Sequence, residues 1–214
     1  AAGLLFVGCL EPARIFGLGF ANMLQGVPFF FDDTIKATYT GGFFGLLNPF
    51  AILTGLVSVG MLLLHGAVWL QLKTTDELRE RSRGVAVVLG LATAALFGIA
   101  GIWLAMGIDG YVITSEVVGD AASNPLTKTV VREEGAWLAN YGKYPLMMLA
   151  PAIGLLAPLA AVVLSLRKHE GWAFVASSLT IAGIILTAGF SMFPFMMPSS
   201  THPSMSLTLW DASS

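Results

Sequence analysis

Long apolar segments constrain this chain more than any other feature. They cover residues 1–24, 44–70, 85–108, 144–166 and 172–197. A bilayer core about 30 Å thick requires about 20 residues of helix at 1.5 Å per residue. A transmembrane strand requires only about 9–11 residues with alternating polarity, so the segments favour helices. The sequence therefore predicts an all-α polytopic membrane protein with about five transmembrane helices.

Composition supports a membrane protein and excludes several functional classes. Hydrophobic residues make up 56% of the chain, charged residues 11%, and the mean hydropathy is +0.78. The net charge is −2, and outside two short loops Lys and Arg do not cluster, so a nucleic-acid partner is not expected. The single cysteine, Cys9, excludes an intramolecular disulfide, a zinc ribbon and a thiolate iron–sulfur site within this chain.

Basic residues indicate an orientation in the membrane. Six of the eleven Lys and Arg residues fall in two short loops, 71–84 and 167–171. Cytoplasmic loops carry an excess of Lys and Arg, so we expect both loops in the cytoplasm. Residues 25–43, 109–143 and 198–214 then form outer loops.

The helices are expected in two hairpins. Asn48-Pro49 and Tyr144-Pro145 each open an apolar segment, and a basic loop and a returning segment follow each. Residues 44–197 are therefore expected to form an antiparallel four-helix bundle. Residues 1–24 would be the remnant of a preceding bundle, and 198–214 would lead to a missing last helix. The chain begins without methionine, and we expect it to be truncated at both ends.

Polar side chains fall on one face of two apolar segments. Thr54, Ser58 and His65 lie within roughly 40° of one another at 100° per residue. Thr187 and Ser191 mark a similar face of the last segment. These stripes have two interpretations, hydrogen bonding between packed helices or the lining of a ligand or conduction site. A further segment carries small residues suited to close helix approach, which are Gly90, Ala94 and Gly98.

His65 is the only histidine inside an apolar segment. It is a candidate for a haem ligand, a proton relay, a quinone hydrogen bond or a structural contact. The expected helix places it near the cytoplasmic end, whereas methionines of the other segments cluster near the outer ends. With no second strong ligand at its level, we expect no haem ligation by this chain.

Glu11 and Arg14 interrupt the first segment at i, i+3 spacing. Such charges either neutralise each other or face a protein-lined or water-filled cavity. Motifs of nucleotide-binding loops, zinc proteases and serine hydrolases are absent from the sequence. We therefore assign no catalytic residue, no metal ligand and no self-contained active site to this chain.

Seven strings along the chain resemble subunit II of the cytochrome bd quinol oxidases, including the cyanide-insensitive oxidases. In chain order they are 22–29, 40–50, 107–112, 122–126, 130–140, 185–200 and 206–214. Their order and spacing match the family along nearly the whole chain. The resemblance implies a nine-helix subunit, of which this chain covers helices four to eight.

The resemblance also implies a function in a bacterial inner membrane. Subunit II of that family pairs with a subunit I carrying two b-type haems and one d-type haem. The complex oxidises quinol and reduces dioxygen to water with protons from the cytoplasm. The resemblance thus implies a non-haem scaffold for subunit I, and it leaves room for accessory membrane subunits and a bound quinone. An alternative from another class is a secondary transporter, which the repeated hairpin and the polar stripes would suit.

Overall fold

The computed structural model describes residues 2–115 and 124–212. Residues 122–123 of the string 122–126, and the final Ser213 and Ser214, lie outside this part. The long helices are α1 (Ala2–Gln25), α2 (Pro49–Lys73), α3 (Asp76–Gly107), α5 (Leu149–Leu166) and α6 (Glu170–Met192). Of the described residues, four helices are long and apolar enough to cross a membrane: α2, α3, α5 with the turn before it, and α6. The all-α polytopic membrane fold is therefore confirmed.

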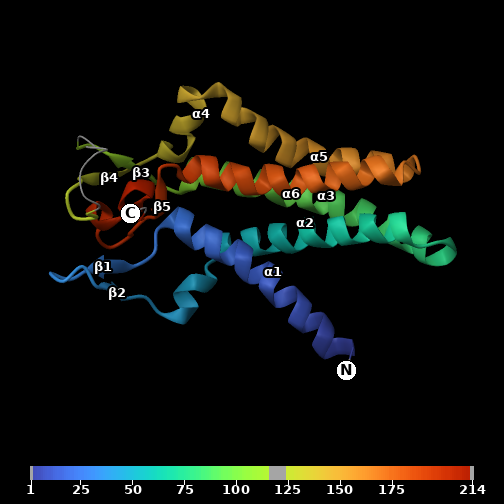
Figure 1. Cartoon of the computed structure of the whole chain (residues 1–214), viewed down its shortest axis with the longest axis horizontal. Helices are drawn as coiled ribbons and strands as arrows, with labels where there is room; N and C mark the ends of the chain where they lie inside the picture. The colour runs from blue at the N-terminus through green and yellow to red at the C-terminus, as the bar shows by residue number, and fades with distance from the viewer. Residues whose placement is uncertain (1, 116–123, 213–214) are drawn as a thin grey trace.

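Four helices lie side by side along the long axis of the molecule (Figure 1). Helix α2 packs against α3 and α6, and α5 packs against the same two helices. Helix α1 packs on α2, and its N-terminal end points away from the other helices (Figure 1). With 24 residues, α1 is long enough to cross a bilayer, and its crossing stays a prediction.

Small residues allow the helices of this bundle to approach closely. A Cβ built on Gly90 of α3 would lie 2.4 Å from Val162 of α5, which agrees with the close approach expected of this stripe. Between α5 and α6, a Cβ on Gly183 would lie 2.5 Å from the backbone nitrogen of Gly154. These positions bring backbones together where a side chain would hold them apart.

The prediction that residues 71–84 form a loop is wrong. Helix α2 continues to Lys73 and α3 begins at Asp76, so only Thr74 and Thr75 connect them. The charged residues continue the helix because acidic groups suit its first turn, and Glu77 pairs with Arg81 at 3.6 Å. The second expected loop, 167–171, is also shorter, because α6 begins at Glu170.

The start of α2 follows the expected Asn-Pro signal. The Asn48 side chain accepts a hydrogen bond from the Ala51 amide at 2.9 Å, and Pro49 is the first helical residue. The Tyr144-Pro145 signal begins a short 3-10 turn, η3 (Pro145–Met148), which leads into α5. A proline thus stands at the start of each hairpin, where its missing N–H has no partner to lose.

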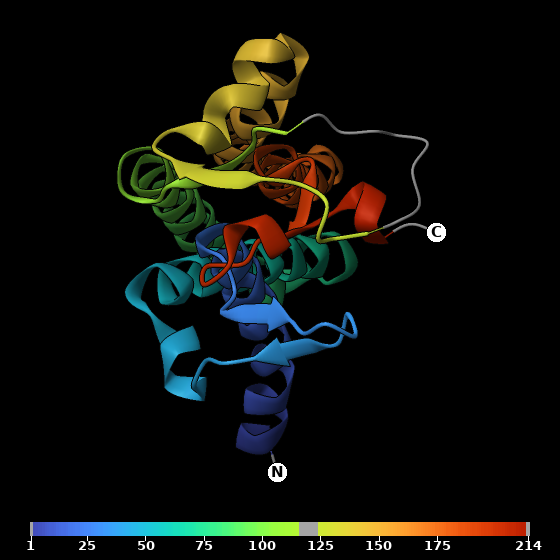
Figure 2. The same ribbon diagram turned by 90° about the vertical axis from the view of Figure 1, so that its left-hand side faces the viewer.

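Short elements cover the end of the bundle opposite the two basic connections (Figures 1 and 2). In the described part of the chain, three two-stranded antiparallel sheets lie there: β1 (Phe29–Phe31) with β2 (Ala37–Tyr39), β3 (Gly110–Ile113) with β4 (Val130–Glu133), and β5 (Phe195–Met197) with β6 (Leu207–Thr208). The remaining elements are η1 (Phe43–Leu47), η2 (Ala136–Leu138), α4 (Ala139–Lys143), η4 (Pro203–Met205) and α7 (Leu209–Ala212). We call this set the outer cap.

Trp137 joins the outer cap to the bundle. Its side chain is 1% exposed, and its indole N–H donates to the Leu24 carbonyl at 3.0 Å. The rings of Tyr111 and Phe195 lie 5.7 and 6.3 Å from the Trp137 ring. The end of α1 is therefore held by the same aromatic cluster that fixes β3 and β5.

Candidate functional site

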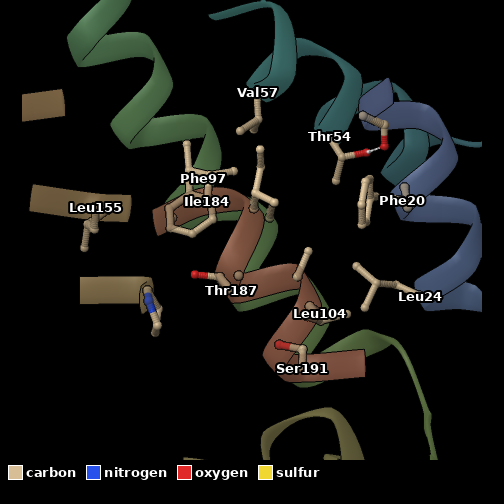
Figure 3. A pocket seen from close by; sticks show the side chains of 18 of the residues that line it. Phe20, Leu24, Thr54, Val57, Phe97, Leu104, Leu155, Ile184, Thr187 and Ser191 are labelled. Atoms are coloured by element: carbon tan, nitrogen blue, oxygen red, sulfur yellow. Dashed lines mark hydrogen bonds between the residues drawn. The ribbon is translucent and has the colours of Figure 1, made fainter. Parts of the chain in front are cut away.

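An apolar cavity of about 450 Å³ lies between α1, α2, α3, α5 and α6, on the side of the outer cap. Its wall includes Phe20 and Leu24 from α1, Phe97 from α3 and Leu155 from α5, which surround the space in Figure 3. A few hydroxyl groups interrupt this apolar wall. Sites for small amphipathic molecules have this character, because apolar walls hold the ligand and a few polar atoms orient it.

Four of the seven residues singled out from the sequence line this cavity. They are Thr54 and Ser58 on α2 and Thr187 and Ser191 on α6. The two predicted polar stripes therefore meet at one cavity, although they lie more than 100 residues apart in the chain. His65 and the Glu11–Arg14 pair do not line it.

The α2 hydroxyls differ in their hydrogen bonding. Thr54 lies 3.0 Å from the Gly17 carbonyl and 2.9 Å from the Ala51 carbonyl, so its single proton is used by the α1 or α2 backbone. Ser58 is 3% exposed, and among the described residues its hydroxyl has no hydrogen-bond partner. Ser58 thus contributes to the cavity wall a buried hydroxyl whose proton no described residue accepts.

Tyr141 of α4 organises the outer end of the cavity. Its hydroxyl donates to the Thr187 carbonyl at 3.0 Å and lies 2.9 Å from the Ser191 hydroxyl. A phenol has one proton, so Ser191 donates in the second contact and keeps its acceptor lone pairs. Burial raises the pKa of the Tyr141 phenol, and the Ser191 hydrogen bond opposes part of that shift. The phenol thus stays a donor at neutral pH.

His65 contacts α6 in the half of the bundle that lies away from the outer cap. Its Nδ1 lies 2.9 Å from the Ser177 hydroxyl, and its ring lies 4.8 Å from the Phe174 ring. Trp69 packs on the same phenylalanine at 5.4 Å. In the described chain the ring of His65 thus packs between α2 and α6, and the absence of haem ligation stays a prediction.

Glu11 and Arg14 form the ion pair that their spacing allows. One guanidinium nitrogen of Arg14 donates to both carboxylate oxygens of Glu11, each at 2.8 Å. The side chains are 40% and 55% exposed, respectively. The pair therefore lies on the surface of this helix, away from the cavity.

The described residues contain no group of three His, Cys, Asp or Glu side chains that could hold a metal ion. Acidic side chains gather with basic ones at the two ends of the bundle instead. Arg83 pairs with Glu80 and Glu170, and Lys128 pairs with Asp211 at 2.6 Å.

Three buried polar residues were not singled out from the sequence. Tyr141 lies in a stretch expected to be a loop, and its only sequence signal was a place three residues before the α5 segment. Arg83 was read as a loop charge, although i, i+3 spacing from Glu80 indicated a helix. Gln71 shares a helical face with Leu64 and Val68, which was the available sign of burial.

A bundle of membrane-length helices that encloses an apolar cavity defines the class, a polytopic membrane protein. The chain belongs to the cytochrome bd terminal oxidase subunit II family, whose model matches residues 2–214. The predicted family resemblance is thereby confirmed.

Curated relatives agree with this membership. The cytochrome bd-I ubiquinol oxidase subunit 2 of Escherichia coli (strain K12) is 51% identical over 210 residues, which cover 98% of this chain and 55% of the relative. The probable cytochrome oxidase subunit 2 of Haemophilus influenzae is 49% identical with the same coverage. The cytochrome bd ubiquinol oxidase subunit 2 of Bacillus subtilis is 27% identical over 99% of this chain and 53% of the relative. The chain thus spans about half the length of the relatives it matches.

Proposed function

We propose that this chain is part of the non-haem subunit II of a cytochrome bd-type terminal oxidase. The complex would oxidise quinol and reduce dioxygen to water with protons from the cytoplasm. The observation that carries the proposal is 51% identity to a ubiquinol oxidase subunit 2 across 98% of this chain. No active site of its own is required, because two b-type haems and one d-type haem would be held by subunit I.

The physical role of these helices would be to scaffold subunit I in a bacterial inner membrane. Outward-facing apolar side chains, such as Val88 and Ile102 of α3 and Leu156 of α5, are 61–66% exposed. In lipid, helices associate through close packing more than through the hydrophobic effect. Such faces suit contact with lipid, with subunit I and with small accessory subunits.

The basic connections between the helices would face the cytoplasm. The α2–α3 and α5–α6 connections lie at the same end of the bundle, opposite the outer cap (Figure 1). Lys73 and Arg81 flank the first connection, and Arg167 and Lys168 lie in the second. The excess of Lys and Arg on cytoplasmic loops supports this orientation. The outer cap would then lie in the periplasm.

The cavity would hold a quinone. Its apolar wall suits a prenyl chain, and the polar atoms that face it are few. The Ser58 hydroxyl, unpartnered among the described side chains, would donate to a quinone carbonyl, whereas Ser191 would accept from a quinol hydroxyl. A purely apolar molecule, such as a lipid acyl chain, would fill the cavity without using the Ser58 and Ser191 hydroxyls.

Quinone content tests this assignment. Ala105→Phe places a ring inside the cavity wall, whereas Ala182→Phe adds the same ring on the exposed face of α6. We expect quinone extracted from the purified complex to fall at least several-fold in the first variant and not in the second. Equal quinone content in both variants would remove the cavity as its site.

The oxidase function is tested in membranes that lack the full-length protein. We expect them to lose quinol-dependent dioxygen consumption and to regain it when the wild-type gene is returned. The rival function, a secondary transporter, rests on the repeated hairpin. It is less favoured because α2, α3, α5 and α6 run without a break near their centres, where transporters often have one. Substrate flux into liposomes free of haem protein would revive it.

A further inference from the structure

Gln71 lies at the C-terminal end of α2 and is 0% exposed. Among the described residues, neither its amide nitrogen nor its amide oxygen has a hydrogen-bond partner. Ser165 on α5 is also 0% exposed, and its hydroxyl likewise has no hydrogen-bond partner among the described residues. Buried polar groups in native proteins nearly always pair with protein or with ordered water, so these three atoms call for a partner.

Helical spacing places both residues in one layer of the bundle. Val68 of α2 and Ala86 of α3 belong to one apolar cluster. Gln71 lies one turn beyond Val68, and Arg83 lies one turn before Ala86, on the same side of the cluster. Arg83 in turn donates from Nε to the Ser165 carbonyl at 2.8 Å. Helical spacing therefore places Gln71 at the level of Arg83 and Ser165, just beyond the apolar cluster.

Ion pairs close this layer toward the basic end of the bundle. The Arg83 side chain is 8% exposed, and its Nη2 donates to Glu170 at 2.9 Å while Nη1 donates to Glu80. With the bond to Ser165, three of the five guanidinium N–H groups are used. The layer thus combines two further guanidinium donors with an amide and a hydroxyl that have no hydrogen-bond partner among the described residues.

We propose that Gln71, Arg83 and Ser165 form an internal hydration site that binds ordered water. At least one water molecule bridges the Gln71 amide and the Ser165 hydroxyl. Such a water accepts from the Gln71 amide nitrogen or donates to the Gln71 amide oxygen, and its second hydrogen bond goes to the Ser165 hydroxyl, so one water satisfies one end of the amide. The apolar cluster with Leu64 and Val68 separates this site from the cavity near the outer cap. The site is independent of the proposed oxidase function.

Density for water is the direct test. In a cryo-EM map of the whole complex that resolves buried waters elsewhere, we expect a peak within hydrogen-bond distance of both Gln71 and Ser165. A map of that quality with no peak beside Gln71 would overturn the proposal. A peak bonded to Gln71 but out of reach of Ser165 would overturn the bridge.

A double-mutant cycle tests the bridge in solution. Gln71→Met and Ser165→Ala each remove one partner of the shared water. We expect both single variants to lower the Tm of the purified complex, and the double variant to lose clearly less than the two losses added together. Additive effects, or single variants that each raise Tm, would show that Gln71 and Ser165 do not share a stabilising water, and would contradict the proposal.

The control cycle combines Gln71→Met with Ser178→Ala. The Ser178 hydroxyl donates to the Phe174 carbonyl of its own helix at 2.9 Å, so it has no part in the layer. We expect additive Tm changes for this pair. If Gln71→Met fails to assemble, Gln71→Leu replaces it, and the water density in the wild-type complex remains a separate test.

Discussion

The hydroxyls of Tyr141 and Ser191 lie 2.9 Å apart and join the outer cap to α6 at the end of the apolar cavity. The same phenol donates to the Thr187 carbonyl, so one side chain ties α4 to two turns of α6. Ser191 was expected from its place on a polar stripe. Its partner was not, because Tyr141 lies 50 residues earlier in a stretch that was expected to be a loop.

Tyr141→Phe removes both hydrogen bonds while keeping the ring. It leaves the buried Ser191 hydroxyl without its acceptor, so we expect a loss of about 1–3 kcal/mol in unfolding free energy. Denaturant or thermal unfolding of the purified complex measures the loss. The matched control is Tyr144→Phe, whose side chain is 45% exposed and for which the change should stay within about 0.5 kcal/mol. Equal effects would contradict the role of Tyr141.

Gly183 and Gly189 of α6 should respond to alanine in opposite directions. A Cβ on Gly183 meets the Gly154 backbone at 2.5 Å, so Gly183→Ala should cost about 1–3 kcal/mol by forcing α5 and α6 apart. A Cβ on Gly189 meets nothing within 4 Å, and Gly189→Ala should stabilise by about 0.5–1 kcal/mol through helix propensity. Thermal unfolding separates the two, and stabilisation by Gly183→Ala would show that the contact is not tight.

The Glu11–Arg14 pair gives a third expectation. Arg14→Leu alone should destabilise the complex more than replacement of both residues by Leu, because the single change leaves a carboxylate without its cation. The order of the two Tm values is the measurement. If the double variant is as unstable as the single variant, or less stable, the two side chains act separately.

Asp211 gives the expected pH dependence of the outer cap. Its burial opposes ionisation, but hydrogen bonds from Lys128 and Thr208 outweigh that effect, and its pKa lies below the ordinary value of 3.8. A depressed folded-state pKa contributes stability that is complete above the ordinary value and is lost as the pH falls through the folded-state value. We therefore expect Tm to fall below about pH 4 more steeply in wild type than in Asp211→Asn.

The control for this comparison is Asp33→Asn, at an exposed position in the connection between β1 and β2. Its Tm should follow the wild-type pH dependence. Parallel curves for wild type and Asp211→Asn would mean that the Lys128 contact does not contribute to folding in this range.

Segment length and apolar content were enough to predict the membrane helices. The proline starts and the glycine stripe on α3 also followed from local chemistry, because both depend on residues close in sequence. The edges were less predictable. The charged residues 76–83 looked like a loop, yet their i, i+3 and i, i+4 spacing lets α3 continue past the apolar stretch.

The cavity itself could not be predicted from the sequence. Its wall depends on which helices are neighbours, and the order α2, α3, α5, α6 around the bundle is a tertiary property. The Lys128–Asp211 contact shows the same limit, because it joins a loop residue to the short helix α7, far apart in the chain. The sequence indicated which residues carry hydroxyl groups on the polar faces. Only packing decides which hydroxyl, such as that of Ser58, has no acceptor among the described residues.

The absorbance spectrum of the affinity-purified full-length protein tests the central claim most directly. We expect a haem-bearing partner to co-purify, with b-type and d-type bands and quinol-dependent dioxygen consumption. The same preparation with His65→Ala should keep every band, because His65 contacts Ser177 and Phe174 and would hold no haem. Purification without any haem-bearing partner, or loss of a band in His65→Ala, would contradict the account.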